Sequence, residues 1–561
     1  MNKIQSIKLS VSGMTCDHCA TTISKKLDLP GIIQKEVSYP GEHADIQYDP
    51  EQISEQDLVE AINATGHYRV TSVDSPEQTV SETSENKGPS KTDGSYDYDL
   101  VIIGGGSAAF AAAIKTSEMG GKALIINSGL PTGGTCVNVG CVPSKTLIRT
   151  AEAYHRAAHP GFKGIESQVR LDDFKTVIDQ KRELVDDLRQ QKYIDVIKDD
   201  PNITLQEGRG RFINEHTIEA NGQTVRGGNI LIATGASPFI PDIPGLKEAG
   251  YLTNESAYEL EELPGHLVVL GGGYIALENA QMFARLGSKV TILQRSAHVL
   301  SDQSEELAEG ITGYLRNEGI NVLTNTTIER VLPAGDEVVV EMSANGKKFR
   351  LKTTHILVAA GRRGNTENLG LESLGLTTEG RGYLPVDETM RTSVANIFAS
   401  GDVTGRHQYV YTAAYEGKLA VENAMNGTSN KVDYSVLPWV IFTDPQVAGI
   451  GMDERLAQQA GIDYEASKLT LDNVPRSIAA RDTRGFIKLI RNRKTDRLIG
   501  ARILAPEGSE LLMELAMAMR HGVTVKSLIS EFHPYLTLSE GIKLAALTFD
   551  KDVNKLSCCA V

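Results

Sequence analysis

Two glycine-rich turns, each directly after a short apolar stretch, constrain this chain more than any other feature. In a dinucleotide-binding unit the first glycine permits a tight turn, and the second lets the backbone approach a pyrophosphate. A third small residue lets the following helix pack closely on the sheet, and the N-terminus of that helix offers free N–H groups to phosphates. The two turns are Gly104-x-Gly106-x-x-Ala109 and Gly271-x-Gly273-x-x-Ala276.

The two turns lie about 170 residues apart, which is too far for a short repeat. We therefore predict two Rossmann-like dinucleotide-binding domains in an α/β protein, with the second domain inserted into the first. The first domain is expected at 96–250 and 366–430, and the second at 251–365. No further fingerprint follows, and apolar stretches with helical character, such as residues 508–522, predict a third, α+β domain at 431–561.

The first 70 residues read as a separate small unit. Their alternation of strand-like and helix-like segments fits the order β-α-β-β-α-β, a ferredoxin-like layout. Residues 71–95 are mostly Ser, Glu, Thr, Lys, Pro and Gly, which predicts a flexible linker.

Composition excludes several classes of function. The net charge of −15 gives no electrostatic support for a nucleic-acid partner. No apolar run approaches the roughly 20 residues that span a bilayer, and no signal peptide is evident, so we expect a cytoplasmic protein. In a reducing compartment, cysteines in close pairs favour metal binding or redox chemistry over structural disulfides. The pairs are Cys16 and Cys19, Cys136 and Cys141, and Cys558 and Cys559.

The residues that follow each fingerprint bear on the choice of dinucleotide. A carboxylate is expected about 20 residues after the first turn, where it binds a ribose hydroxyl, but the chain has Asn127 there. After the second turn the corresponding positions are Gln294 and Arg295. An arginine can pair with the 2′-phosphate of NADP, so this domain is expected to bind NADPH, unless Arg295 is merely a solvated surface residue.

The stretch GGTCVNVGCVPSK, which carries Cys136 and Cys141, resembles the redox disulfide of the pyridine nucleotide–disulfide oxidoreductases, the family of glutathione reductase and dihydrolipoamide dehydrogenase. The resemblance covers residues 97–550 and includes ATGASP at 233–238, VAAGRRGNT at 358–366 and the pair Gly401-Asp402. It implies that Cys141 lies against a flavin and that Cys136 is the outer thiol. It also implies that Lys145 lies near the flavin and pairs with Glu278.

The same resemblance assigns the cofactors. It implies that FAD is held by Gly104, Gly106, Ala109, Asn127, Thr135, Lys145, Thr234, Gly235 and Asp402. NADPH is then held by Gly271, Gly273, Ala276 and Arg295.

Disulfide-reducing members of this family carry a histidine near the C-terminus in a pattern like His-Pro-Thr-x-x-Glu. The corresponding stretch here is EFHPYLTLSEG, and alignment of Thr537 and Glu540 puts Tyr535 at the histidine position. A tyrosine with a pKa near 10 is a poor acid–base catalyst at neutral pH. A second alignment, with a two-residue insertion, would let His533 serve as the base.

Two further features point to a soft metal ion. The motif GMTCxxC at Cys16 and Cys19 resembles heavy-metal-associated domains, and the chain ends with Cys558 and Cys559. Thiolates select soft cations over Mg²⁺ or Ca²⁺. All of these features occur together in the mercuric reductases, which the chain resembles over its full length.

That resemblance implies reduction of Hg²⁺ to Hg⁰ in a homodimer. Cys558 and Cys559 of one subunit would pass Hg²⁺ to Cys136 and Cys141 of the other, with Tyr535 and Tyr193 lining the shared site. Two other hypotheses stay open at this point. One is an NADPH-dependent disulfide reductase with a fused metal-binding domain and His533 as its base. The other is a metal-storage protein whose reductase module keeps its thiols reduced.

Overall fold

The computed structural model describes residues 4–12, 23–24, 26–27, 29–38, 43–50, 52–63, 68–74 and 96–552. The chain divides into two compact units, 1–87 and 88–561, which are described in turn. Four of the six cysteines, Cys16, Cys19, Cys558 and Cys559, lie outside the described residues. Within those residues, no helix is long and apolar enough to cross a membrane.

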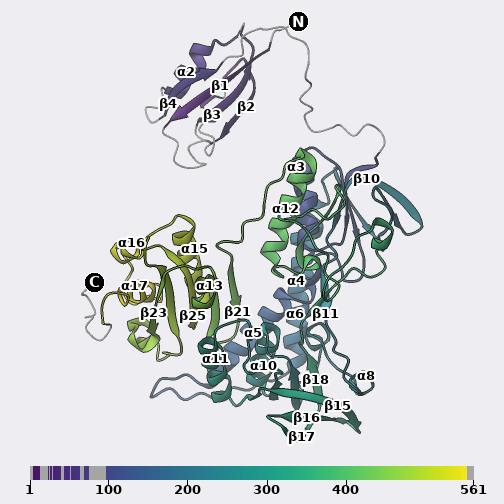
Figure 1. Ribbon diagram of the computed structural model, residues 1–561, viewed down its shortest axis with the longest axis vertical. Coiled ribbons are helices and arrows are strands. Elements are labelled where there is room, and N and C mark those ends of the chain that lie inside the picture. The colour runs from purple at the N-terminus through teal and green to yellow at the C-terminus, as the bar shows by residue number, and fades with distance from the viewer. Residues whose placement is uncertain are drawn as a thin grey trace. The chain divides into compact units, whose positions relative to one another are not determined.

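The N-terminal unit contains a four-stranded antiparallel sheet in the order β2-β3-β1-β4, as expected for a ferredoxin-like layout (Figure 1). Alternate residues of β1, such as Leu9 and Val11, are buried with Leu58 and Ile62 of helix α2. This period of two places one face of the sheet in the core. The elements are β1 (Gln5–Ser12), β2 (Ile32–Ser38), β3 (His43–Tyr48), α2 (Glu55–Asn63) and β4 (Arg69–Asp74).

The predicted start of the linker at residue 71 is wrong. Strand β4 continues to Asp74, and Val73 and Asp74 still pair with Leu9 and Lys8 of β1. Polar composition suggested a linker here, but the backbone pairing with β1 is independent of side-chain polarity. The remaining predicted linker residues, 75–95, lie outside the described part of the chain.

The first dinucleotide-binding domain is built on a sheet whose central strands are parallel. Strand β20 follows the second domain in the chain yet pairs in parallel with β10, so the second domain is inserted into the first, as predicted. Every residue of β6 is buried, which is typical of a strand covered on both faces. The strands are β5 (Tyr98–Ile103), β6 (Ala123–Asn127), β7 (Ile203–Glu207), β10 (Gln223–Ile232) and β20 (Ile397–Ala399), with β8 (Arg211–Asn214) and β9 (Thr217–Ala220) as an antiparallel extension.

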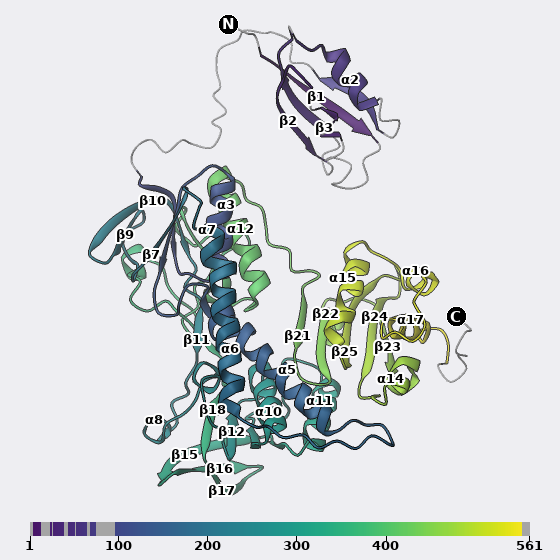
Figure 2. The same cartoon turned by 180° about the vertical axis from the view of Figure 1, so that it is seen from behind.

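Two helices from distant parts of the sequence hold this domain together. Helices α3 (Ser107–Glu118) and α12 (Val410–Asn426) lie side by side in both views (Figures 1 and 2). A Cβ added at Gly417 would lie 2.4 Å from the carbonyl oxygen of Ala108. Only glycine allows the two helix backbones to approach this closely.

The second domain has a parallel sheet in the order β14-β13-β12-β18. Its helix α10 shares a hydrophobic core with α5 (Cys141–Ala158) of the first domain, where Leu147 and Ala151 pack in one cluster with Leu277 and Ala280. The elements are β12 (His266–Leu270), α10 (Tyr274–Leu286), β13 (Lys289–Leu293), α11 (Glu305–Asn317), β14 (Asn321–Leu323) and β18 (His355–Val358), with an antiparallel sheet of β15 (Thr326–Ala334), β16 (Glu337–Ala344) and β17 (Lys347–Thr353). Short strands β11 (Ala236–Pro238) and β19 (Arg362–Gly364) pair where the two domains join.

The C-terminal domain is centred on an antiparallel sheet in the order β21-β22-β25-β24-β23. Residues 508–522, which suggested a long helix, form a 3₁₀ turn at Gly508–Leu511 and then the nine-residue helix α15. The domain is α+β as expected, but its strands rather than its helices form the centre. The elements are β21 (Pro438–Ile441), β22 (Gln446–Gly451), α13 (Glu454–Gln459), β23 (Tyr464–Thr470), α14 (Pro475–Ala479), β24 (Phe486–Asn492), β25 (Leu498–Ala505), α15 (Leu512–Arg520), α16 (Val525–Ser530) and α17 (Glu540–Leu547).

Removal of residues 1–95 should leave the rest of the chain folded. The core of the N-terminal unit contains residues of that unit alone, and none of the clusters in residues 96–552 includes them. We expect the truncated protein to keep the thermal unfolding midpoint of the corresponding transition in the full chain. A lower midpoint on truncation would contradict this independence.

Candidate functional site

The paired cysteines lie at the start of two consecutive helices, α4 (Gly134–Asn138) and α5 (Cys141–Ala158). Both are free thiols, and Cys141 is the first residue of α5. Gly134 has a φ of +63°, and a Cβ there would lie 2.7 Å from Cα of Gly106. The backbone of the cysteine segment therefore lies in direct contact with the backbone of the first fingerprint turn.

The two thiols have opposite electrostatic environments. The pKa of Cys141 is lowered, first by a hydrogen bond from Cys136 and then by the positive charge of Lys145, against the opposing effect of burial. The pKa of Cys136 is raised by that same hydrogen bond and by burial. A thiol at a helix N-terminus beside a cation is favoured as thiolate. Of the two thiols, Cys141 is therefore the one that loses its proton more readily.

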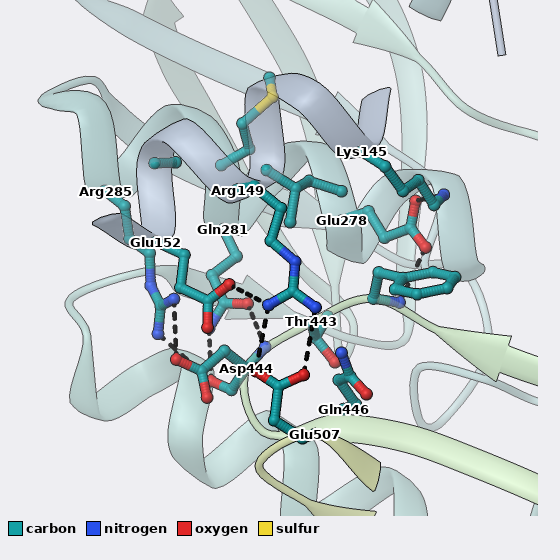
Figure 3. A pocket seen from close by; sticks show the side chains of 14 residues that line it. Lys145, Arg149, Glu152, Glu278, Gln281, Arg285, Thr443, Asp444, Gln446 and Glu507 are labelled. Atoms are coloured by element: carbon teal, nitrogen blue, oxygen red, sulfur yellow. Dashed lines mark hydrogen bonds and ion pairs between the residues drawn. The ribbon is translucent and has the colours of Figure 1, made fainter. Parts of the chain in front are cut away.

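The cation beside Cys141 is held by a buried carboxylate (Figure 3). Lys145 Nζ lies 2.8 Å from Glu278 Oε2, the pairing that the family resemblance implies, and the Glu278 side chain is 4% exposed. The backbone N–H of Phe442 donates to Glu278 Oε1 at 2.9 Å. Three domains thus meet at one carboxylate. Sequence reasoning missed Phe442, because a backbone donor leaves no signature in the residue type.

The chain after Phe442 is fixed to helix α10 by a paired amide contact (Figure 3). Gln281 accepts from the N–H of Asp444 and donates to its carbonyl, both at 2.8 Å. Arg285 Nη1 lies 3.0 Å from Asp444 Oδ2. On the facing helix α5, Arg149 bonds to Glu152 at 2.7 Å and to Glu507 at 3.1 Å. These contacts tie the C-terminal domain to both dinucleotide-binding domains.

A cavity of about 840 Å³ lies against the first fingerprint and the cysteines. Ala109 and Lys145 do not line it: Ala109 is buried within α3, and Lys145 lines a smaller neighbouring cavity of about 60 Å³ with Glu278. The remaining predicted flavin-binding residues and both cysteines do line it, namely Gly104, Gly106, Asn127, Thr135, Cys136, Cys141, Thr234, Gly235 and Asp402.

The cavity wall fits a phosphate-bearing cofactor. Gly104 has a φ of +125°, and a Cβ there would lie 2.2 Å from the carbonyl oxygen of Ala233. Gly106 caps helix α3 without any side-chain bond to its first N–H groups, which leaves those donors free. The hydroxyl of Ser400 is buried in the wall and has no hydrogen-bond partner among the described residues. Such a group is satisfied when a polar ligand fills the cavity.

A second buried carboxylate, that of Glu416, holds the backbone next to Asp402. Asp402 lies in the 3₁₀ helix η3 (Gly401–Thr404), where burial raises its pKa and Arg362, 3.7 Å away, acts in the opposite direction. The fully buried Glu416 accepts from the N–H of Gly401 and from the hydroxyl of Tyr434, both at 2.7 Å. Sequence reasoning found the Gly401-Asp402 pair but missed Glu416.

Tyr193 lies beside the cysteine segment. It belongs to the π-helical turn η1 (Gln190–Ile194), between α6 (Phe174–Arg189) and α7 (Asp195–Ile197). Its hydroxyl lies 3.0 Å from Ser107 Oγ, and a Cβ added at Gly133 would lie 3.2 Å from its ring. Burial raises the pKa of Tyr193, and the hydrogen bond to Ser107 acts in the opposite direction. The tyrosine is therefore neutral at physiological pH.

Tyr535 and His533 lie in the segment between α16 and α17, in the C-terminal domain. Tyr535 is 53% exposed, whereas the His533 side chain is 7% exposed and lies 2.7 Å from Glu514 of α15. The buried Glu540 accepts from the backbone N–H of Leu536 at 3.2 Å. Within the described residues of one chain, this segment does not line the cavity that holds the cysteines.

The second fingerprint has the same backbone geometry as the first. Gly271 has a φ of +121°, and a Cβ there would lie 2.3 Å from the carbonyl oxygen of Ala359. Gly273 caps helix α10, and Ala276 is fully buried under the turn. Arg295, two residues after β13, is exposed, and no ion pair joins it to another residue in the part of the chain that the structure describes. Its guanidinium is available to an anionic ligand.

Comparison with known proteins agrees with this geometry. Residues 98–417 match the family model described as pyridine nucleotide-disulphide oxidoreductase, and residues 437–546 match the dimerisation domain of the same family. Residues 8–67 match the heavy-metal-associated domain.

Individual relatives and solved structures were also found. The chain is 40% identical to a mercuric reductase of Staphylococcus aureus over 99% of both chains, and 40% identical to one of Bacillus cereus over 100% of this chain and 88% of that protein. A solved structure described as the Cu(II) complex of HOCl-induced flavoprotein disulfide reductase RclA from Escherichia coli is 31% identical, with a TM-score of 0.73 over 81% of this chain and 99% of that one. With a family model over more than half of its length and full-length relatives at about 40% identity, the chain belongs to the pyridine nucleotide-disulphide oxidoreductase family, among the mercuric reductases.

Proposed function

We propose that this protein reduces Hg²⁺ to Hg⁰ at Cys136 and Cys141, with electrons that NADPH supplies through FAD. The observation that carries the proposal is the position of two free thiols, one favoured as thiolate, in the wall of a dinucleotide-sized cavity. FAD held in the cavity lined by Gly104, Gly106 and Asp402 would supply the two-electron redox chemistry that connects NADPH with the cysteines. The overall reaction balances, because one hydride carries the two electrons that Hg²⁺ takes up, leaving NADP⁺ and a proton.

The chemistry of the pair suits a soft cation. The thiolate of Cys141 is ready to bind Hg²⁺, and the proton on Cys136 leaves when the metal takes its place. The ion pair with Glu278 holds Lys145 in place, and the positive charge of Lys145 stabilises the thiolate form of Cys141. Tyr193 contributes a neutral hydroxyl and ring surface next to the thiols.

The C-terminal segment favours a metal substrate over a disulfide. Reduction of a disulfide requires protonation of the leaving thiolate, whereas Hg⁰ leaves without a proton. The exposed position in this segment carries Tyr535, and His533 is turned inward onto Glu514. We therefore assign no acid–base role to His533.

Several finer points belong to the same proposal. Arg295 selects NADPH by pairing with its 2′-phosphate, and the fingerprint residues with Asp402 hold FAD. Cys558 and Cys559 deliver Hg²⁺ to the cysteine pair of the other subunit in a homodimer, whose shared site includes Tyr535. Cys16 and Cys19 bind the same soft ion in the N-terminal unit. The reaction takes place in the cytoplasm, where a reducing environment keeps such thiols free.

Replacement of both active thiols should abolish mercury reduction without loss of the cofactor. In a Cys136→Ala, Cys141→Ala protein we expect Hg²⁺-dependent NADPH oxidation to fall to the background rate, because no thiolate remains to bind the ion near the cavity. The assay measures NADPH consumption and elemental mercury in the headspace. Native rates in this variant would disprove the proposal, as would rapid turnover of oxidised glutathione by the wild type with none for Hg²⁺.

Substitution of His533 separates metal reduction from disulfide reduction. A His533→Ala change should leave turnover with Hg²⁺ within about twofold of wild type, because product release needs no proton. A His521→Ala protein serves as the matched control for loss of a histidine in the same domain. A collapse of turnover in His533→Ala alone would instead support the disulfide reductase hypothesis.

Removal of the cation beside Cys141 should shift the pH dependence of its reactivity. Lys145 lowers the pKa of this thiol, so in Lys145→Met the pKa should rise, and less thiolate is present at neutral pH. The measurement is the rate of Cys141 alkylation by iodoacetamide against pH, localised by mass spectrometry. Lys431→Met, which removes a surface lysine paired with Glu388, should leave the profile unchanged. An unshifted profile in Lys145→Met would exclude this role.

A further inference from the structure

The residue at the end of β6 departs from the usual dinucleotide-binding pattern, and the adjacent strand supplies what it lacks. Asn127 ends β6 where a carboxylate is expected. Glu207 ends the neighbouring strand β7, and the two residues are direct partners in the parallel pairing of these strands. A carboxylate is therefore present at this end of the sheet, but it belongs to β7, one strand further out than the strand on which it is expected.

The hydrogen bonds of Asn127 fix the orientation of its amide. Its Nδ2 group donates to the carbonyl of Leu130 at 3.1 Å and to the Glu207 carboxylate at 3.3 and 3.4 Å. A carbonyl and a carboxylate are both acceptors, so only the NH₂ side of the amide can face them. The hydroxyl of Thr132 also lies within bonding range of Glu207, at 3.4 Å, and helps to hold the carboxylate in place.

This orientation turns the amide oxygen toward the fingerprint turn. A Cβ added at Gly105 would lie 2.3 Å from Asn127 Oδ1, so the oxygen lies directly against the backbone of that turn. Asn127 and Gly105 both line the 840 Å³ cavity. Because both N–H groups of the amide are already used, the polar atom that Asn127 has left for a ligand is Oδ1, an acceptor suited to a hydroxyl rather than a phosphate.

We propose that Glu207 is a positioning residue that turns the Asn127 amide so that its oxygen accepts a hydrogen bond from a ribose hydroxyl of the adenosine half of FAD. The inference rests on the proposed use of FAD. Glu207 does not itself line the cavity; it acts through Asn127. The pair reproduces the acceptor of an acidic residue while its negative charge stays back from the cofactor's phosphates.

The test is a double-mutant cycle on FAD binding by the full-length apoprotein, measured by quenching of flavin fluorescence. Glu207→Ala should raise the Kd for FAD by about tenfold, because the Leu130 carbonyl alone then holds the amide in this orientation. In an Asn127→Leu background the same change should alter the Kd by less than about twofold. Glu207→Gln keeps an oxygen acceptor for Nδ2 and should stay within about threefold of wild type.

Two further measurements separate this role from a structural one. The thermal midpoint of the apoprotein should be the same for wild type and Glu207→Gln, and Glu219→Ala on β9 serves as a control for loss of a nearby carboxylate. An equal effect of Glu207→Ala in both backgrounds would overturn the inference while the proposed function stands. A wild-type apoprotein that binds no FAD would overturn the proposed function, and this inference with it.

Discussion

The buried carboxylate of Glu278 is the contact on which the rest of the site depends. It accepts from Lys145 of the first dinucleotide-binding domain, belongs to the second, and accepts from the backbone of Phe442 at the edge of the C-terminal domain. Loss of Lys145 would leave the buried Glu278 carboxylate without its counter-charge, which is destabilising. The three domains are thus held in the arrangement that places a cation next to Cys141.

Much of the fold and part of the site could be predicted from the sequence, for a physical reason. The first glycine of each fingerprint, Gly104 or Gly271, has a positive φ angle and would collide with a neighbouring backbone carbonyl if it carried a side chain, so residue type and geometry are linked at these two positions. The insertion of one domain into another followed from two such fingerprints, and the pairing of β20 with β10 confirms it. The expected pair of Lys145 and Glu278 is present for a comparable reason, since the buried carboxylate of Glu278 needs a counter-charge.

Other features depend on contacts that no local pattern records. Phe442 acts through its backbone, and Glu416 and Glu207 act through partners that are close only after the sheet has formed. Strand β4 continues into a polar stretch because it is paired with β1, and polar composition alone indicated a linker. The apolar residues 508–522 were expected to form one long helix, but the chain makes a 3₁₀ turn before α15. The spacing of Tyr535 and His533 in the sequence does not show which side chain is exposed. The fold of residues 531–539 decides this.

The insertion also determines the order in which the chain can fold during synthesis. Strand β20 and helix α12 complete the first dinucleotide-binding domain. They are synthesised only after the whole second domain, because they follow it in the chain. The parallel sheet of the second domain, from β12 to β18, is continuous in sequence and can form first. Until residue 426 emerges, the apolar face of α3 that α12 covers is exposed, and such surfaces promote aggregation. Nascent chains stalled before this point should therefore need chaperones more than those released after it.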